Sequence, residues 1–449
     1  MSGQRLRMPL FLFAVLLASL AGGSGALAKD AAPHQGLNNA PDAIVAINKP
    51  LRGIVLAREG STVVRVGGAH IGTGLTSVRT DSAGRYLIPA EIRTDHLNVV
   101  SAGYEVERRV TTADYVVTFL KPLDVRAIYI PYDELRRTEV MEWTLGLARS
   151  NLISAVVVDV KDEAGSVLPL AATQQVIDMR AVRSTGTDVE GFLTELGELG
   201  VYRIARVVTF LDGRFARAFP ADAILTATGS VFVDSIGLAW SNPFSEAARA
   251  HNVAIGVEAA KWFDEVQYDY VRLPTDPGVV VRNNATPEAR SAAITAFTRE
   301  AASALHAVGA ALSIDTFGQT TVIDHDVGIG QVLEAMAPHL DNYSPMVYPS
   351  TWTAGWFGLS YPPSNPFLVV KTSVGLAVQR VAPFETVLVR PWLQDFHDYQ
   401  SRKLYYSASE VQAQIDASAE AGGSGFMLWD PSLNYHLSVL EELRTASSR

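Results

Sequence analysis

The stretch DEVQYDYVRLP, residues 264–274, decides the fold that the sequence predicts. Read as an extended chain, it alternates between an apolar side and a polar side. The apolar side consists of Val266, Tyr268 and Tyr270, and the polar side of Glu265, Gln267 and Asp269. We expect the apolar side to pack against helices. Asp269 then projects from the far end of the strand into a pocket shared with other strands.

Seven further apolar, strand-like runs flank this stretch between residues 125 and 430. In chain order the eight runs are 125–130, 153–161, 202–210, 264–274, 311–318, 342–350, 385–396 and 425–430. Helical patterns lie between them, for example over 245–262, 286–308 and 409–421. Strands that alternate with helices indicate parallel βα units, and eight such units predict an α/β fold, a (β/α)8 TIM barrel over residues 123–449.

An open, doubly wound sheet is the alternative arrangement of parallel βα units. That fold places a glycine-rich phosphate turn after its first strand. The corresponding segment here, YIPYDEL (residues 129–135), contains no glycine. The closed barrel is therefore favoured.

Residues 50–122 have a different sequence pattern, with short runs of alternating apolar and polar residues separated by turn residues such as DSAG (81–84). This pattern predicts a small all-β sandwich domain in front of the barrel. TDSAGRYLIP (80–89) and VVSAGYEVERRVT (99–111) resemble the carboxypeptidase-regulatory-like or Ig-like accessory domains of exported proteins. The resemblance implies a spacer or binding module without chemistry of its own.

The first 28 residues have the pattern of a secretory signal peptide. Arg5 and Arg7 precede the apolar run MPLFLFAVLLASLAGG, and ALA at 26–28 offers a cleavage site. An uncleaved anchor is the alternative, but the run falls short of the ~20 residues that a membrane span needs. Residues 29–49, rich in Ala, Pro and Asn, are expected to be a linker. We therefore expect an exported protein, periplasmic or extracellular, with no stable membrane span after cleavage.

Composition excludes several classes of function. The chain of 449 residues carries a formal net charge of −10 and no long basic run, which argues against a nucleic-acid partner. It has no cysteine, so disulfides, thiol nucleophiles and thiolate metal sites are absent. Neither H-E-x-x-H nor G-x-S-x-G occurs, and no cofactor signature or metal site is expected.

Polar and aromatic side chains gather where the predicted barrel strands end, which is where barrel active sites lie. Strand alternation puts Gln267 with Asp269, and Ser313 with Asp315, on the same face. The predicted catalytic residues are Asp269, Asp315 and Asp159. The predicted substrate-binding residues are Lys161, Arg206, Trp240, Asn242, Gln267, Arg272, Tyr348, Trp352, Arg390, Trp392, Gln394 and Trp429.

Glycoside hydrolysis is the chemistry that best fits carboxylates combined with aromatic rings. It needs two carboxyl groups flanking one bond, while aromatic rings stack on sugars. We expect Asp269 to act as nucleophile or base and Asp315 as general acid, with Asp159, Lys161 and Arg206 tuning them. Each residue also has a structural interpretation: Asp159 can be an ion-pair partner of Lys161 or Arg206, and Trp352 can simply pack under a loop.

Several segments carry a family likeness over residues 125–440. AVVVDVKDEAGSV, LSIDTFG and VRPWLQDF, together with the stretch around Asp269, resemble the DUF4015 group of bacterial TIM-barrel proteins, which is similar to glycoside hydrolases. In related barrels an Asp at the end of the fourth strand is the nucleophile, and this matches Asp269. The acid/base on the fifth strand is often Glu in such barrels, whereas the matching position here holds Asp315.

The resulting prediction is an exported glycoside hydrolase, with no cofactor, whose partner is a polysaccharide or cell-envelope glycan. A non-catalytic glycan-binding protein on the same scaffold is the main alternative, since aromatic residues suit both. A metal-dependent deacetylase or phosphoesterase is a third, disfavoured by the scarcity of His at the strand ends. Retention would follow from carboxyl groups ~5–5.5 Å apart and inversion from ~6.5–9.5 Å.

Overall fold

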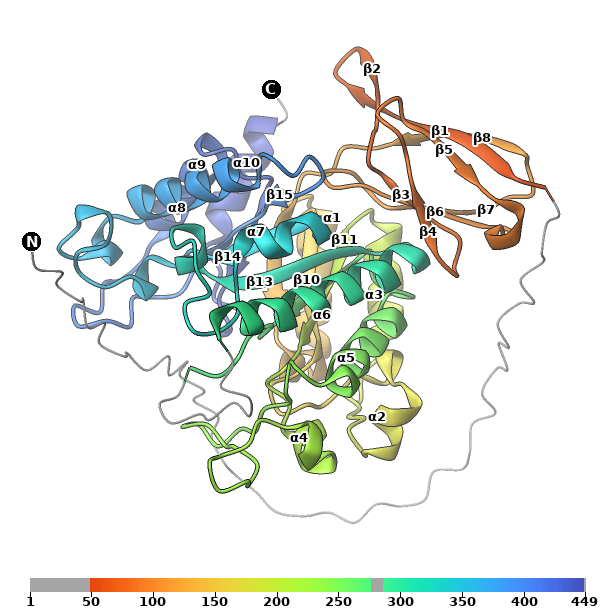
Figure 1. Ribbon diagram of the computed structural model, residues 1–449. Coiled ribbons are helices and arrows are strands. Elements are labelled where there is room, and N and C mark those ends of the chain that lie inside the picture. The colour runs from red at the N-terminus through yellow and green to blue at the C-terminus, as the bar shows by residue number, and fades with distance from the viewer. Residues whose placement is uncertain (1–48, 276–285, 448–449) are drawn as a thin grey trace, which may run out of the picture.

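The computed structural model describes residues 49–275 and 286–447, and its largest unit is a closed parallel barrel (Figure 1). The predicted signal peptide and most of the predicted linker lie outside the described residues. The barrel strands are β9 (Arg126–Ile130), β10 (Ala155–Lys161), β11 (Tyr202–Val208), β12 (Glu265–Asp269), β13 (Ala311–Phe317), β14 (Asn342–Met346), β15 (Leu388–Val389), β16 (Trp392–Gln394) and β17 (Phe426–Trp429).

The hydrogen-bonded order β13-β12-β11-β10-β9-β17-β16-β14 closes through pairing of β13 with β14. The closure confirms the TIM barrel and excludes the open doubly wound sheet. The seventh strand is split into β15 and β16 at Arg390–Pro391, where proline lacks the N–H that continues a ladder. β15 pairs with β14 alone, while β16 pairs with both β14 and β17.

Helices surround the barrel at the positions that the sequence predicts. The longer ones are α1 (Thr138–Arg149), α3 (Val189–Glu198), α5 (Glu246–Ala259), α6 (Pro287–Val308), α8 (Pro366–Val381), α9 (Ala408–Glu420) and α10 (Leu437–Ser447). Short helices α2 (Gln174–Asp178), α4 (Gly213–Ala218) and α7 (Leu333–Met336) lie between them. Local sequence fixes their ends: Ser245 and Thr286 accept the capping bonds of α5 and α6, and Gly309, at φ 80°, ends α6.

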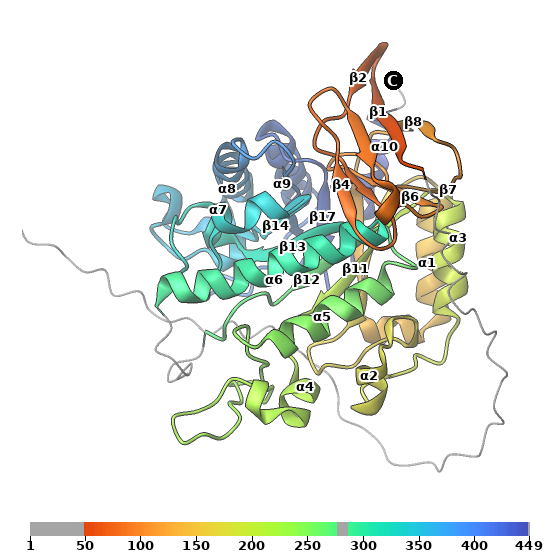
Figure 2. The same ribbon diagram turned by 45° about the vertical axis from the view of Figure 1, so that its right-hand side comes forward.

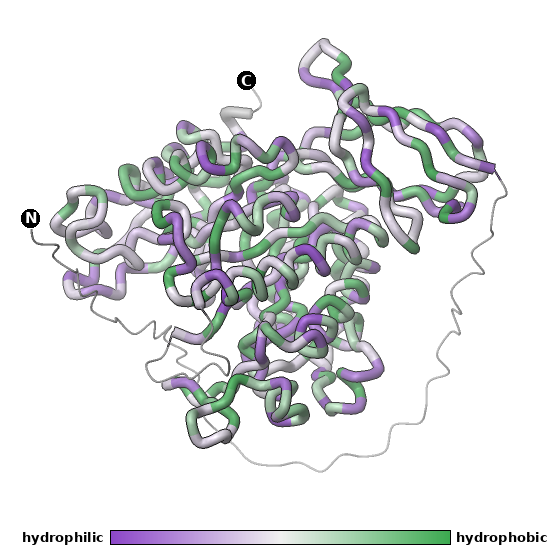
Figure 3. The backbone as a smooth tube through the Cα atoms, in the orientation of Figure 1, coloured by the Kyte–Doolittle hydropathy of each residue, from purple (hydrophilic) through white to green (hydrophobic). Residues whose placement is uncertain are grey.

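Two apolar cores separate the inside of the barrel from its helical shell. The shell core contains Val266 and Tyr268, whereas the lumen core contains Ile204, Trp392 and Met427. Hydrophobic segments run along the strands of the barrel in Figure 3. The polar side of β12 therefore faces the lumen, as its alternating pattern predicts.

The N-terminal domain is a β-sandwich, which confirms the predicted all-β fold; its likeness to Ig domains stays a prediction. One sheet contains β1 (Leu51–Glu59), β2 (Thr62–Arg65), β5 (Arg85–Ile88) and β8 (Tyr115–Leu120), and the other β3 (His70–Gly72), β4 (Ser77–Arg79), β6 (His96–Val100) and β7 (Glu107–Val110). Both sheets supply side chains to one core, including Val55, Ile71 and Val99. Most pairs are antiparallel, while β1 and β8 run parallel.

The sandwich docks on the end of the barrel opposite the carboxyl ends of the strands (Figure 2). Arg108 donates to Asp264 Oδ1 at 3.0 Å and to the carbonyl oxygens of Phe263 and Gly309. The backbone of β3 comes so close to the end of α6 that a Cβ at Gly72 would meet the His306 carbonyl oxygen at 2.3 Å. Glycine is therefore required there for the two domains to pack.

Candidate active site

The carboxyl ends of the barrel strands place a ring of polar and aromatic side chains around one mouth. The ring consists of Tyr129 on β9, Asp159 on β10, Arg206 on β11, Asp269 on β12, Asp315 on β13, Trp392 on β16 and Trp429 on β17. Six of these seven were predicted from the sequence. Period-2 alternation at each strand end therefore brings together residues that are far apart along the chain.

Arg206 lies at the centre of the carboxylate cluster. Its Nη1 donates to Asp159 Oδ1 at 2.7 Å, and its Nη2 and Nε donate to Asp269 Oδ2 at 2.6 and 3.1 Å. The same Nη2 contacts Glu163 Oε1 at 3.1 Å. One buried guanidinium thus holds three carboxylates, and charge-assisted bonds of this kind favour their ionised forms.

Asp269 is the last residue of β12. Its Oδ1 accepts from the N–H of Tyr270 at 2.6 Å, and its Oδ2 accepts from Arg206. Tyr270 has φ 53°, a left-handed conformation that costs a bulky residue roughly 1–2 kcal/mol. Strain at such a position is typical of functional sites. Tyr270 therefore does not continue the apolar side of the strand; its ring packs beside Trp240.

Asp315 is the more deeply buried member of the pair, 2% exposed against 6% for Asp269. Burial first, and then the charge of Asp269, raises the pKa of Asp315 well above its usual range, although Arg206 and Trp392 act in the opposite direction. The indole Nε1 of Trp392 donates to Asp315 Oδ1 at 2.6 Å. A buried carboxyl group with a raised pKa beside a carboxylate bonded to arginine is an arrangement that can separate an acid from a nucleophile.

Asp159 completes the cluster on the opposite side of Arg206. Tyr129 Oη donates to Asp159 Oδ2 at 2.6 Å, and the N–H of Tyr132 contacts the same oxygen at 3.2 Å. Burial raises the pKa of Asp159 to about 6, against the opposing charge of Arg206. Asp159 is therefore an ion-pair partner of Arg206 and not of Lys161, and its catalytic role stays a prediction.

Aromatic rings line the mouth beside the carboxylates. Tyr129 and Trp429 stack at 4.1 Å between ring centroids, and Trp392 meets Trp429 edge to face at 5.3 Å. The Arg206 guanidinium lies 5.3 Å from the Trp429 ring centroid. Burial, followed by the charges of Asp315 and Asp269, raises the pKa of Tyr348 well above its usual range, so this phenol stays neutral in the same cluster.

Lys161 lies outside this cluster, although it follows Asp159 by two residues. Its Nζ contacts Asp212 Oδ2 at 2.6 Å and Asn252 Oδ1 at 2.7 Å in the helical shell. The cause is a bulge in β10: Asp159 pairs with Arg206, but Lys161 pairs with Val207, which faces the shell. A direct contact of Lys161 with the predicted catalytic carboxylates is therefore not formed.

Arg272 lies against Trp240, and Asn242 follows Trp240 by two residues in the loop before α5. The Arg272 guanidinium lies 4.8 Å from the Trp240 ring centroid and 4.7 Å from that of Phe317. Trp240 Nε1 donates to Asp234 Oδ2 at 3.0 Å, and Asn242 Oδ1 accepts from the N–H of Phe244 at 3.1 Å. Their roles as substrate ligands stay predictions, and Trp240 is buried.

The remaining predicted residues lie within the barrel or its loops. Gln267 donates to Ser344 in the lumen, and Arg390 pairs with Glu265 Oε2 at 2.9 Å near the other end of the strands. Gln394 bonds Ser350 and thereby holds the loop after β14. Trp352 in that loop has no exposed surface and packs on Trp356 and Phe357. It is therefore a packing residue under the loop and has no surface available to a sugar.

Sequence reasoning missed two residues of the mouth, Glu163 and Tyr129. The Glu163 side chain is 29% exposed, compared with 9% for Asp269 and 3% for Asp159, so it is the most accessible carboxylate on Arg206. It follows Asp159 by four residues in a loop, where no periodicity applies. Tyr129 could have been found, because alternation in 125–130 places it inward with Ala127.

One group of side chains in the described part of the chain has the composition of a metal site. It consists of His70, His306 and Asp341, whose ligand atoms lie within 4.8 Å of one another between the sandwich and the barrel. However, the Arg79 guanidinium contacts His70 Nε2 at 2.9 Å, and the His70 and His306 rings stack at 3.5 Å. A cation beside the ligand atom and stacked imidazoles do not suit a metal ion.

A match to one solved structure supports the fold. The PgaB (BpsB) glycoside hydrolase domain from Bordetella bronchiseptica matches with a TM-score of 0.52 and 14% identity, over 72% of this chain and 98% of that one. The endo-β-1,4-mannanase from Thermotoga petrophila matches with a TM-score of 0.47 and 11% identity, over 72% and 76%. A hypothetical protein from Ruminiclostridium thermocellum is 25% identical over 42% of this chain and 96% of its own, with a TM-score of 0.38. No curated protein matches.

A closed (β/α)8 barrel whose carboxylates gather at the C-terminal mouth makes this a protein of the TIM-barrel class. Within that class the family is shown by sequence. Residues 127–435 match the family DUF4015, described as "Putative glycosyl hydrolase domain". The chain belongs to this family, and the resemblance found in its motifs is confirmed.

Proposed function

We propose that this protein is an exported glycoside hydrolase that acts on a polysaccharide or cell-envelope glycan. The observation that carries the proposal is the pair of carboxyl groups on β12 and β13. Asp269 is held by the Arg206 guanidinium, while burial and the charge of Asp269 raise the pKa of Asp315. One carboxyl group is bonded to a cation and the other is buried with a raised pKa, and glycoside hydrolysis uses two carboxyl groups in such different environments. Export rests on the N-terminal signal pattern alone.

In the proposed reaction, Asp269 attacks the anomeric carbon while Asp315 gives its proton to the departing glycosidic oxygen. The bond between that carbon and oxygen breaks, and a glycosyl ester on Asp269 forms. Asp315, now ionised, takes a proton from water, whose oxygen attacks the same carbon and releases Asp269. Arg206 stabilises the carboxylate of Asp269 before the first step and after the second.

The position of the two strands favours retention of anomeric configuration. Tyr268 pairs with Ile314, so the next residues, Asp269 and Asp315, follow at matching positions on neighbouring parallel strands. Such strands lie about 4.8 Å apart. That spacing supports the shorter carboxyl separation, ~5–5.5 Å, rather than the ~6.5–9.5 Å of inverting enzymes.

A non-catalytic glycan-binding protein is the second candidate function. It is favoured by the low exposure of Asp315, 2%, and by hydrogen bonds that occupy both oxygens of Asp269. Binding through Trp429 and its neighbours would not need either carboxyl group to react. Turnover separates the two candidates.

The test is the release of reducing ends from a panel of polysaccharides and cell-envelope glycans. We expect the wild-type protein to release them from at least one glycan, and Asp269→Asn to lower kcat/KM at least about a thousandfold. Asp416→Asn, an exposed carboxylate on α9, is the matched control and should be fully active. Equal release by wild type and Asp269→Asn would exclude the assignment, and binding without release would favour the second candidate.

A further inference from the structure

The outer face of the sheet formed by β1, β2, β5 and β8 carries an unusual concentration of exposed apolar side chains. On β8, Tyr115, Val117 and Phe119 are 59, 43 and 49% exposed, and Val63 on β2 and Leu87 on β5, across β1 in the same sheet, are 48 and 49% exposed. These are five of the fifteen large hydrophobic residues exposed in the described part of the chain. Contiguous apolar surface of this kind marks interaction sites.

Arginines alternate with these apolar side chains on the same face. Arg52 pairs in register with Tyr115 on one side and Leu87 on the other, and Arg58 pairs with Val63. Arg65 is opposite Leu56, and Arg85 opposite Ile54. Within residues 49–275 and 286–447, Arg85 forms an ion pair with Asp81, whereas Arg52, Arg58 and Arg65 form none. The face is therefore cationic in a chain whose net charge is −10.

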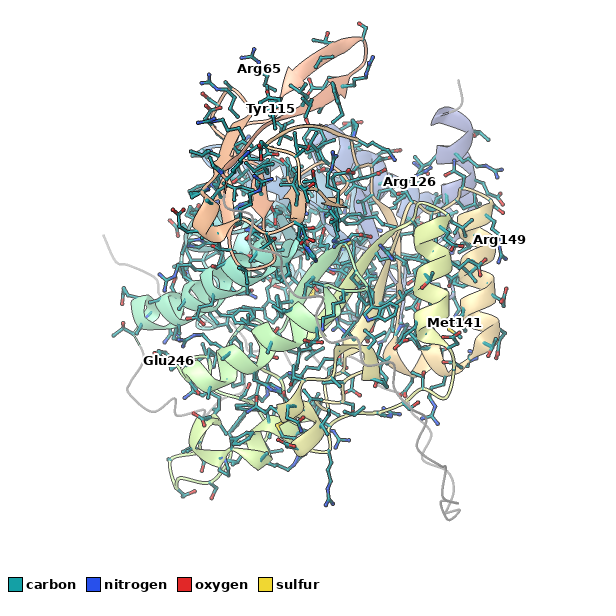
Figure 4. All side chains as sticks on the ribbon, turned by 90° about the vertical axis from the view of Figure 1, so that its right-hand side faces the viewer. Arg65, Tyr115, Arg126, Met141, Arg149 and Glu246 are labelled. Carbon is teal, nitrogen blue, oxygen red and sulfur yellow. The ribbon has the colours of Figure 1, made fainter. Side chains whose placement is uncertain are left out.

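This face is turned away from the barrel. The other sheet of the sandwich packs on α6 through β3, β4 and β6. Figure 4 labels Arg65 and Tyr115 on the sandwich and Glu246, at the start of α5, near the opposite end of the molecule. A ligand on the face would not block the mouth at the carboxyl ends of the barrel strands.

We propose that this outer face, called the arginine–aromatic face and defined by Arg52, Arg58, Arg65, Arg85, Tyr115 and Phe119, binds a polysaccharide that carries carboxylate groups. The rings of Tyr115 and Phe119 lie four residues apart on one strand, about 13 Å, which suits stacking on separate sugars of one extended chain. Arginine forks match carboxylates in bidentate geometry. The inference goes beyond the proposed function and requires no turnover by the barrel.

The choice of a glycan over an anionic membrane rests on the shape of the face and on the family of the barrel. Its rings are fixed on a sheet and its arginines alternate with them, whereas membrane-binding surfaces gather their basic residues beside a face that inserts. The same chain carries a glycosyl hydrolase domain over residues 127–435. A second glycan contact on the sandwich would hold the barrel at its polymer without competing for the mouth.

The experiment is affinity electrophoresis of the full chain carrying Asp269→Asn, in gels that contain polygalacturonate or, for comparison, neutral hydroxyethylcellulose. The test variants are Tyr115→Ala with Phe119→Ala, and Arg52→Gln with Arg65→Gln. All four positions are exposed, so the fold is not expected to change, and circular dichroism checks this. Tyr405→Ala, at a tyrosine 70% exposed on the barrel, is the matched control. Flotation with phosphatidylglycerol vesicles and light scattering complete the set.

We expect polygalacturonate to retard the protein and each double variant to raise the dissociation constant about tenfold or more. Added salt should weaken the retardation, because exposed charges are screened, and Tyr405→Ala should bind like its parent. Equal retardation of parent and double variants would overturn the proposal. Binding to vesicles alone, or self-association that the double variants abolish, would overturn it too and assign the face to a membrane or a second copy. None of these outcomes bears on whether Asp269 supports hydrolysis.

Discussion

At the scale of single residues, Arg206 supplies the positive charge around which the carboxylates of the mouth are arranged. It is buried, and its guanidinium contacts Asp159, Glu163 and Asp269. Removing one partner of a buried, hydrogen-bonded charge group leaves the others uncompensated. Arg206 thus offers its positive charge to Asp159 and Asp269 through direct hydrogen bonds, whereas burial dominates at Asp315 and raises its pKa.

The identity of the proton donor can be read from a pH profile. If Asp315 is the general acid, kcat/KM falls on the alkaline side as Asp315 loses its proton, at a pH well above the usual range of an aspartic acid. Asp315→Asn should abolish this alkaline limb and spare substrates with good leaving groups, such as nitrophenyl glycosides. Glu163→Gln should lower kcat/KM and retain the limb. Loss of the limb in Glu163→Gln alone would make Glu163 the donor.

Sequence reasoning located most residues of the mouth that lie on strands, but it missed Tyr129 on β9 and Glu163 on a loop. Asp269, Asp315 and Arg206 follow from alternation within apolar runs, because period 2 fixes which side chains face inward. Glu163 lies beyond the end of β10, where its position depends on the contact with Arg206. The left-handed backbone of Tyr270 could not be predicted either, because this conformation is usually indicated by a glycine in the sequence.

At the scale of the elements, a bulge in β10 changes the direction in which the Lys161 side chain points. The extra residue at Val160 turns Lys161 from the lumen to the shell, where it meets Asp212 at the start of α4. The pattern of apolar residues predicted this strand correctly. It could not reveal the bulge, since the alternation in 155–161 reads the same with or without it.

The buried pair of Lys161 and Asp212 makes a prediction about stability. Both side chains are almost fully buried, and Asn252 also accepts from Lys161. Lys161→Met removes the ammonium partner of Asp212 and leaves it the contacts with His251 Nε2 at 3.4 Å and the N–H of Phe215. The loss of the buried charge pair should lower the free energy of unfolding by about 3–5 kcal/mol. Lys161→Met with Asp212→Asn should recover part of that loss in urea unfolding. A loss of unfolding free energy below about 1 kcal/mol in the single variant would show that buried Asp212 does not need Lys161 as its charge partner.

At the scale of the whole molecule, the junction between sandwich and barrel contains a stacked histidine pair. His70 on β3 stacks on His306 at the end of α6, which bonds Asp341 at 2.8 Å, and Arg79 contacts His70 from the sandwich side. Burial first, and then the charge of His306, lowers the pKa of His70 from 6.5 to about 3. The docked arrangement therefore requires neutral His70.

This junction should make the protein less stable as the pH is lowered. The unfolded chain binds a proton at His70 below about pH 6.5, whereas the folded chain does so only near pH 3, so stability is full above 6.5 and declines between these values. At pH 5 the His70 contribution is at most about 2 kcal/mol. Unfolding in urea at pH 7.5 and pH 5 should show a smaller loss for His70→Gln than for wild type. His96→Gln, at an exposed histidine, is the control, and equal losses in all three would contradict the account.

Both domains and the closure of the barrel could be predicted from the sequence, but their docking could not. Eight apolar runs and the strand pattern of 50–122 define each core through local periodicity. The junction depends on Gly72, His70 and Arg108, which belong to short strands with no apolar pattern toward the barrel. Among the described residues no helix has the length and apolar character of a membrane span.

The central claim is that Asp269 and Asp315 together hydrolyse a glycosidic bond, and digestion in H2¹⁸O with mass spectrometry of the products tests it most directly. The account predicts that wild-type protein produces shortened glycans that carry one ¹⁸O atom at each new reducing end, and that Asp269→Asn produces none. Product glycan incubated with Asp269→Asn gives the background of spontaneous exchange. Unlabelled products, or labelled products formed equally well by Asp269→Asn, would contradict it.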